Sequence, residues 1–138
     1  MRRRKKKNKP ANIFAAIVVL SIILIPMIDF DKDELSTYNE LFIHKTDPFN
    51  PDTDFDLILD NEEITIYLSN PNLNDTDSDG LTDGEEIKTY KTNPAMNDTD
   101  SDGLTDKYEL FESLTNVTNP DSDNDGLTDG AEVNIHET

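Results

Sequence analysis

The feature that most constrains this chain is an acidic loop that recurs at intervals of 23 residues. It reads DTDSDGLTDGEE at 75–86, DTDSDGLTDKYE at 98–109 and DSDNDGLTDGAE at 121–132. Each copy has carboxylates at loop positions 1, 3, 5, 9 and 12 and a glycine at position 6. This is the ligand spacing of a calcium loop, in which position 7 contributes its backbone carbonyl and Glu at position 12 can bind through both oxygens. The pattern therefore predicts three calcium sites.

The predicted ligands occupy the same loop positions in all three copies. They are Asp75, Asp77, Asp79, Leu81, Asp83 and Glu86, then Asp98, Asp100, Asp102, Leu104, Asp106 and Glu109, then Asp121, Asp123, Asp125, Leu127, Asp129 and Glu132. The leucines would contribute only their carbonyls, and position 9 often binds through a water molecule. The chain has no cysteine and no paired histidines, which disfavours zinc and copper sites. A flexible all-oxygen loop with a bidentate Glu suits calcium better than magnesium.

Two further loops precede these three at the same interval. DTDFDLILDNEE at 52–63 keeps all five carboxylates but has Leu57 at position 6. DFDKDELSTYNE at 29–40 keeps four, with Glu34 at position 6 and Thr37 at position 9. The chain from Asp29 is thus five units, starting at 29, 52, 75, 98 and 121. Whether the first two loops bind calcium stays open, because a residue other than glycine resists the turn.

Charge is divided sharply along the sequence. Seven of the 12 basic residues lie within the first nine positions, and all 30 acidic residues lie from Asp29 onward. The part from Asp29 therefore carries 5 basic against 30 acidic residues, which excludes nucleic acid as its partner and favours divalent cations. Only 34% of all residues are hydrophobic, so a large core is excluded and bound metal is the expected source of stability.

Residues 1–28 combine a basic head with an apolar run from Ala11 to Ile28. This pattern is typical of an export signal or an uncleaved membrane anchor. The run lacks small residues at a cleavage site, which favours an anchor, although secretion after signal cleavage stays an alternative. The basic head should stay in the cytoplasm, so we expect a single-pass cell-membrane protein with its acidic units outside.

The residues between the loops repeat as well. Positions 7 and 13 are apolar in all five units, and we expect them to form a thin core. Thr82 and Glu85 form a capping box that predicts a helix from about Asp83 to Lys91, ended by Asn93-Pro94. Asn-Pro or Asp-Pro pairs predict a turn between units, shifted to Asn119-Pro120 after the fourth.

DSDNDGLTDGAE and the TNP spacer at 92–94 resemble thrombospondin type-3 repeats of prokaryotic surface proteins. The resemblance covers residues 29–138 and is strongest from about residue 70. It implies a calcium-bound rod with little regular structure that serves as a surface module or spacer. Animal members carry cysteines, and their absence here follows the prokaryotic pattern. The substituted glycines are where the first two units depart from the family.

We therefore expect a repeat protein with little regular structure, made of tandem 23-residue calcium loops each followed by a short helix, with one N-terminal apolar helix. Its parts are the head and anchor (1–28), two degenerate units (29–74) and three intact units (75–138). Expected partners are calcium ions, the membrane through residues 11–28, and a surface protein or cell-envelope component. The alternative is a dockerin-like calcium-dependent docking module. We see no nucleophile or phosphate-binding loop, so we expect no enzyme activity.

Overall fold

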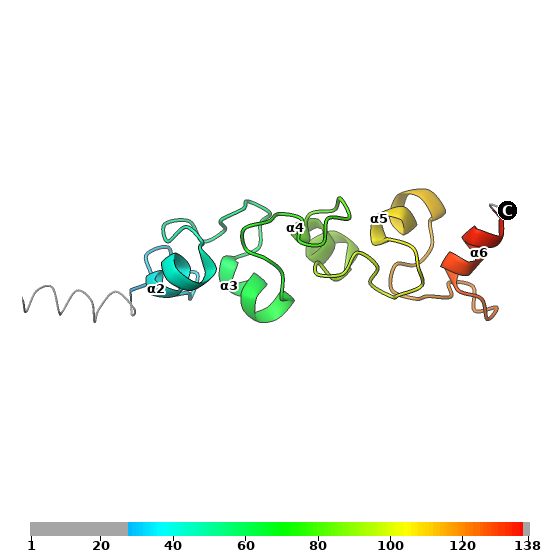
Figure 1. The fold of residues 1–138 in the computed structure, drawn as a ribbon, viewed down its shortest axis with the longest axis horizontal. Coiled ribbons are helices and arrows are strands. Elements are labelled where there is room, and N and C mark those ends of the chain that lie inside the picture. The colour runs from blue at the N-terminus through cyan, green and yellow to red at the C-terminus, as the bar shows by residue number, and fades with distance from the viewer. Residues whose placement is uncertain (1–27, 137–138) are drawn as a thin grey trace, which may run out of the picture.

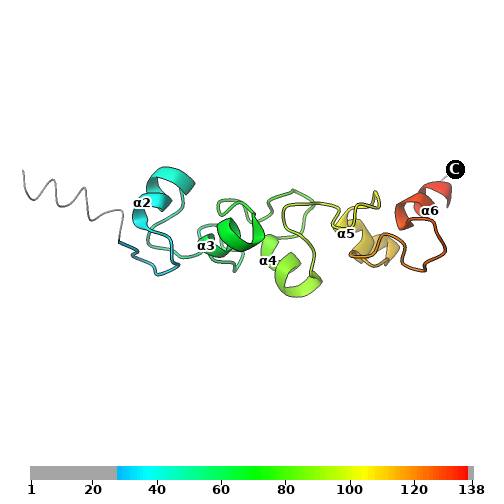
Figure 2. The ribbon, with the colours of Figure 1, turned by 90° about the horizontal axis from the view of Figure 1, so that it is seen from below.

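The computed structural model describes residues 28–136 of the chain. Five units follow one another in a single row, and the two ends of the described chain lie at opposite ends of that row (Figure 1 and Figure 2). Each unit is an acidic loop, followed by a short helix and, in the first four units, by a turn that leads to the next loop. The described residues contain no β-strand. The predicted tandem units with short helices and little regular structure are confirmed.

In the first four units the helix has two parts, one α-helical turn and then one wider π-helical turn. The elements are α2 (Thr37–Asn39) with η2 (Glu40–His44), α3 (Asp60–Glu62) with η3 (Glu63–Tyr67), α4 (Asp83–Glu85) with η4 (Glu86–Tyr90), α5 (Asp106–Tyr108) with η5 (Glu109–Ser113), and finally α6 (Asp129–His136). Position 17, which follows each π-helical turn, is left-handed with φ of 60–67°. A left-handed residue ends a helix. The helix of unit 3 therefore ends at Tyr90, before the predicted stop at Asn93-Pro94 is reached.

The helices begin as the sequence predicts. The Thr82 side chain accepts a hydrogen bond from the Glu85 N–H, and the Glu85 carboxylate accepts one from the Thr82 N–H. This confirms the capping box. Thr105 and Thr128 also accept a bond from the N–H of position 11, at 3.3 and 3.2 Å, without the reciprocal carboxylate.

The core is a line of side chains from two positions of the repeat. Position 7 is 1–8% exposed in the first four units (Leu35, Ile58, Leu81 and Leu104). Position 20, in the turn between units, is buried as well (Pro48, Pro71, Pro94 and Val117). The prediction of a second core stripe at position 13 is wrong as a general rule, because Leu41 is 44% exposed and its equivalents are only half-buried. Each of the first four helices turns the Glu of position 12 inward instead.

The turn between units keeps one geometry throughout. The Asn93 side chain accepts from the N–H two residues on, and its carbonyl accepts from the N–H three residues on, at 3.2 and 2.9 Å. After unit 4 the same two bonds form at Asn116, with Val117 in the place of proline. The predicted shift of this turn to Asn119-Pro120 is therefore wrong. An Asx side chain is sufficient to form the turn without proline.

Neighbouring units are joined by bonds that span 28 residues. The backbone N–H of Lys107 donates to Asp79 at 3.3 Å, and that of Gly130 donates to Asp102 at 2.9 Å. Each bond links position 10 of one helix to the position 5 aspartate of the preceding loop. A Cβ on Gly130 would overlap the Asp102 carbonyl oxygen, so glycine permits this close approach.

The predicted membrane anchor, residues 11–28, lies almost wholly outside the described residues. Within residues 28–136, no helix is long and apolar enough to cross a bilayer.

Candidate metal centre

The loop of unit 3 is held in shape by its own carboxylates. Asp75 accepts hydrogen bonds from the N–H groups of positions 4 and 6, at 2.8 and 3.1 Å. Asp77 accepts from the Asp79 N–H at 3.1 Å, and Asp79 from the Leu81 N–H at 2.7 Å. These bonds wrap the backbone around the aspartates, so that one oxygen from each of the three lies within 4.8 Å of the others. The spacing of the sequence thus gives a cluster of convergent oxygens.

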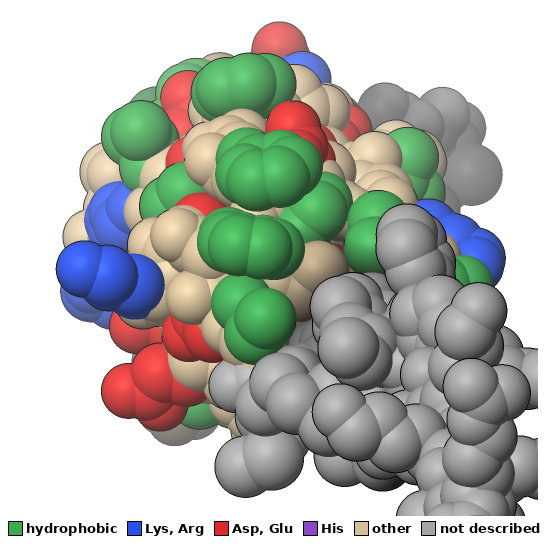
Figure 3. Space-filling view, turned by 90° about the vertical axis from the view of Figure 1, so that its left-hand side faces the viewer, with side chains coloured by type: hydrophobic (Ala, Val, Ile, Leu, Met, Phe, Trp, Pro, Cys, Tyr) green, Lys and Arg blue, Asp and Glu red, His purple; other side chains and the backbone are tan. Residues whose placement is uncertain are grey.

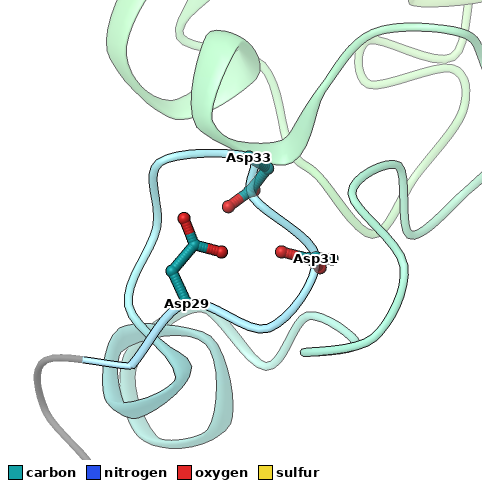
Figure 4. Close-up of side chains that lie close together, drawn as sticks. All are labelled: Asp29, Asp31 and Asp33. Atoms are coloured by element: carbon teal, nitrogen blue, oxygen red, sulfur yellow. The ribbon is translucent and has the colours of Figure 1, made fainter.

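Three other loops form the same triad of positions 1, 3 and 5, with the same 4.8 Å limit. They are Asp29, Asp31 and Asp33; Asp52, Asp54 and Asp56; and Asp98, Asp100 and Asp102. In unit 1 the three carboxylates turn toward a shared centre inside the loop (Figure 4). The first two loops therefore keep the predicted arrangement although the sequence had left this open.

The backbone at position 6 explains how the loops of units 1 and 2 keep the triad. Glu34 and Leu57 adopt φ of 78° and 81°, close to the 93–102° of the glycines at this position in the intact units. A residue with a side chain is strained in this region by about 1–2 kcal/mol. The hydrogen bonds of the loop maintain the turn regardless, since the Leu57 N–H still donates to Asp52 at 3.0 Å.

In the first four units the Glu of position 12 closes the cluster from the helix side, whereas Glu132 of unit 5 is only half-buried. Glu40, Glu63, Glu86 and Glu109 are all 0% exposed. In units 2 to 4 one oxygen of this Glu accepts from the hydroxyl at position 18, as Glu86 does from Thr92 at 3.1 Å. The other oxygen has no hydrogen-bond partner among the described residues, and in Glu40 neither oxygen has one. A buried carboxylate oxygen without a partner is costly unless a cation or a proton neutralises it.

Burial and the neighbouring negative charges raise the pKa of these glutamates. Burial, followed by the charge of Asp54, raises the pKa of Glu63 to about 9. Burial also raises the pKa of Glu86 to about 8, partly opposed by its hydrogen bond from Thr92, and that of Glu40 to about 7. Crowded acids favour protons when no metal is bound. The same crowding favours a divalent cation, which neutralises several carboxylates at once.

Position 9 has a different role from the other carboxylates. Asp83 Oδ1 accepts from the Thr76 N–H at 2.8 Å, and Asp83 Oδ2 accepts from the Thr76 hydroxyl at 2.7 Å. The same pair of bonds, at 2.7–2.9 Å, forms in units 2, 4 and 5. In units 2 to 5 both oxygens of the position 9 aspartate therefore accept hydrogen bonds from position 2 of the same loop. We call this pair of bonds the brace, and forming it is the first role of the position 9 aspartate.

The position 9 aspartate also lies between two loops. Asp83 shares a 4.8 Å cluster with Asp56 and Glu63 of the preceding unit, and all three side chains are buried. Burial raises the pKa of Asp77 in its own loop to about 6, and the charges of Asp79, Asp75 and Asp83 add to that rise. The sequence assigned Asp83, Asp106 and Asp129 only to their own loops, and for Asp83 the geometry adds the loop before it.

The fifth loop is more exposed than the others, and no helix packs on it among the described residues. Asp123 and Asp125 are exposed, and Leu127 is 45% exposed although its equivalents are buried. The hydrogen bonds within the loop are retained, with Gly126 donating to Asp121 at 2.9 Å and Leu127 to Asp125 at 2.9 Å. The following unit therefore supplies the cover of each loop and not its shape.

The donor set fits a hard cation. Asp77 Oδ2, Asp100 Oδ2 and Glu86 Oε2 are buried and lack a hydrogen-bond partner among the described residues. The position 7 N–H of Leu81, Leu104 and Leu127 donates to the position 5 aspartate at 2.7–2.9 Å, which holds the backbone of each residue whose carbonyl is a predicted ligand against the loop. Only oxygens converge on these clusters, and this is the chemistry that calcium prefers.

Sequence reasoning missed the hydroxyls that hold the clusters together. Position 2 is Thr or Ser in units 2 to 5, where its hydroxyl bonds to the position 9 aspartate and accepts from the backbone of the preceding turn, as Thr76 does from Asn70 at 2.9 Å. The sequence did contain a signal of this pairing between positions 2 and 9. Unit 1 lacks both partners, since it has Phe30 at position 2 and Thr37 at position 9.

A row of short units with hydrogen-bonded acidic loops, of which the first four are closed by a buried Glu, defines a tandem acidic-loop repeat protein. Residues 75–97, 98–112 and 121–138 match the family model of the bacterial TSP3 repeat, so the three units from Asp75 onward are repeats of this family. The resemblance seen in the sequence is confirmed for these residues. Comparison with curated proteins and with solved structures found no match.

Proposed function

We propose that the protein is an exported, membrane-anchored rod whose loops are ordered by calcium. The observation that carries the calcium assignment is the Glu of position 12, which is fully buried beside three aspartates with an oxygen that no hydrogen bond reaches. In unit 3 the ion would be held by Asp75, Asp77, Asp79, the Leu81 carbonyl and Glu86. Calcium, when bound, supplies the positive charge that lets these carboxylates stay ionised inside the unit.

The proposal includes the two degenerate loops. The triads of units 1 and 2 meet the same distance limit as those of units 3 and 4, and their position 12 glutamates are equally buried. Glu40 has both oxygens unpaired, which leaves more binding capacity in the loop of unit 1 than the hydroxyl-paired Glu86 leaves in unit 3. The family model matches neither unit, so this part rests on geometry alone.

The rod and the membrane anchor are proposals supported by other features. The described units lie in a row in which each contacts the next, as suits a spacer (Figure 1). The basic head and the apolar run at 11–28 support an anchor that places the acidic units outside the cell. The proposed role is structural, with no catalytic step.

A calcium titration tests the assignment. The full chain in detergent micelles is freed of metal with a chelator and titrated with calcium, with heat and far-ultraviolet circular dichroism as readouts. At calcium tenfold above the dissociation constant, each site contributes about 1.4 kcal/mol to folding. We expect binding and ordering to occur together, with up to five equivalents bound. Absence of both a binding heat and a change in the spectrum would refute the proposal, and equal binding of magnesium would refute the choice of ion.

A further inference from the structure

Unit 1 carries an exposed apolar surface that its fold does not require. Six large side chains, between 42% and 73% exposed, make up this first-unit patch: Phe30, Tyr38, Leu41, Phe42, Ile43 and Phe49. In unit 3 the equivalent residues of positions 2, 14, 15 and 21 are threonine, lysine, threonine and alanine. Since unit 3 adopts the same loop and helix with small or polar side chains at these four positions, the aromatic residues of unit 1 serve something other than folding.

The patch is ordered by contacts among its own rings. Phe30 stacks on Phe49 with ring centroids 5.2 Å apart, and Tyr38 lies 5.1 Å from Phe42. Phe30 occupies position 2, where the other units place the hydroxyl of the brace, and its partner at position 9 has changed as well. Unit 1 has therefore exchanged an internal hydrogen-bonded brace for a surface aromatic pair.

The patch lies where the chain enters the row of units. The Thr37 N–H donates to the Ile28 carbonyl at 2.7 Å. The equivalent bond begins every other unit, as when the Asp83 N–H donates to the Asn74 carbonyl at 3.1 Å. Ile28, the last residue of the apolar run at 11–28, thus occupies the place of the residue that precedes each later loop. No linker separates unit 1 from that run.

The end view of the row shows where these side chains gather. On the face of the first unit, hydrophobic side chains form a broad area beside the point where the chain enters (Figure 3). Two of the five lysines of the acidic part, Lys32 and Lys45, also belong to unit 1. Lys45 donates to the Leu41 and Phe42 carbonyls, and its Nζ lies 5.9 Å from the centre of the Phe42 ring.

We propose that the first-unit patch rests in the interfacial layer of the lipid bilayer, an inference that depends on the proposed membrane anchor. A unit without a linker to a spanning segment is held against the headgroups. Exposed phenyl and phenol rings with lysines at their margin suit that layer, where an apolar face sinks roughly 5–10 Å. Unit 1 is then the membrane-resting foot of the rod, and its loop is the one closest to the lipid.

A single tryptophan tests the proposal, because the chain contains none of its own. The full chain carrying Phe42→Trp is reconstituted into phosphatidylcholine vesicles with calcium and recovered by flotation. The matched control is Phe111→Trp, at the same position 14 of unit 4 and 54% exposed against 60% for Phe42. We expect the emission of the Phe42→Trp variant to shift to the blue and to lose most of its intensity with brominated phosphatidylcholine, while acrylamide quenches only the control.

Each other outcome overturns the proposal. If the vesicles float the chain but acrylamide quenches both variants equally, the patch does not touch lipid and the anchor stands. If Phe42→Trp is shielded from acrylamide and unaffected by brominated lipid, the patch is covered by protein, such as a second copy. If the chain does not float, the anchor and the patch proposal fail together. Phe49→Trp, at a residue that is 73% exposed, repeats the test independently of any effect of Phe42→Trp on folding.

Discussion

Replacing Thr76 by valine isolates the brace that joins consecutive parts of the chain. The substitution keeps the shape of the side chain and removes one oxygen. That oxygen donates to Asp83 at 2.7 Å and accepts from the Asn70 N–H at 2.9 Å, so it joins a loop, a helix start and the preceding turn. No other single atom of unit 3 links these three segments in the described hydrogen bonds.

The expected cost follows from the two bonds. A hydrogen bond to a charged group contributes about 1.5–3 kcal/mol, and a neutral one about 0.5–1.5 kcal/mol. Asn70 is exposed, so water can replace its bond at little cost, whereas Asp83 is 0% exposed and keeps only the Thr76 N–H and a hydrogen bond with the Ser69 side chain. We therefore expect a loss of about 2–3 kcal/mol. If folding and calcium binding are one event, about 2 kcal/mol appears as a roughly 30-fold weaker apparent calcium affinity.

The assay is calorimetric titration of the full chain in micelles, with thermal unfolding followed by circular dichroism. Thr89→Val is the matched control in the same unit. Thr89 lies on the exposed side of η4, and its side chain makes no hydrogen bond to another described residue. Thr76→Val should also lower stability in chelator, because the brace does not involve the metal. If the two valine variants bind calcium equally and unfold together, the brace has no energetic role and the reasoning is refuted.

Three further outcomes are expected. Leu57→Gly should strengthen calcium binding a few-fold, because it relieves the strain of a positive φ at an exposed side chain. Gly103→Leu, at a glycine with open space around it, should weaken calcium binding by about 1 kcal/mol. If calorimetry finds neither change, position 6 is not strained. Glu86→Gln should weaken calcium binding by roughly tenfold or more and yet stabilise the metal-free chain, because it removes a buried charge. The control Glu112→Gln, at an exposed residue, should have neither effect. Melting experiments with and without chelator measure both. The metal-free chain should melt at a higher temperature at pH 5 than at pH 9. The pKa of Glu63 is raised to about 9 in the folded chain, so the stability that its proton gives is lost as the pH rises through that value. A higher melting temperature at pH 9 in chelator rules out this explanation.

Much of the loop could be predicted because its geometry is local. Alternate carboxylates with a turn at position 6 are sufficient to bring three oxygens together, and unit 3 forms this cluster through bonds that span no more than five residues. The capping box at Thr82 is equally local. Such features depend on neighbours in sequence, which a repeating pattern makes visible.

What the sequence did not predict depends on contacts between units. The second role of Asp83, beside Asp56 and Glu63, arises only when a helix packs on the preceding loop. Hydrophobicity indicated position 13 as core, but the helix turns its position 12 carboxylate inward, so Leu41 is left outside. Apolar character cannot predict that a cluster of carboxylates, and not a hydrophobic core, takes the inner face of the helix.

The bonds between units have a direction that shapes how order spreads along the row. The position 5 aspartates Asp79 and Asp102 are bound by the helix of the unit that follows them, and Asp125, on which no described helix packs, is exposed. A unit thus covers the loop before it, whereas its turn only donates one hydrogen bond to the position 2 hydroxyl of the loop after it, as the Asn116 N–H does to Ser122 at 2.8 Å. Stability in such an array is a sum of units and nearest-neighbour contacts. It follows that loosening unit 4 uncovers the loop of unit 3 and removes the bond from the Asn116 N–H to Ser122, while the hydrogen bonds within the loop of unit 5 remain, so the loss of cover passes toward unit 1.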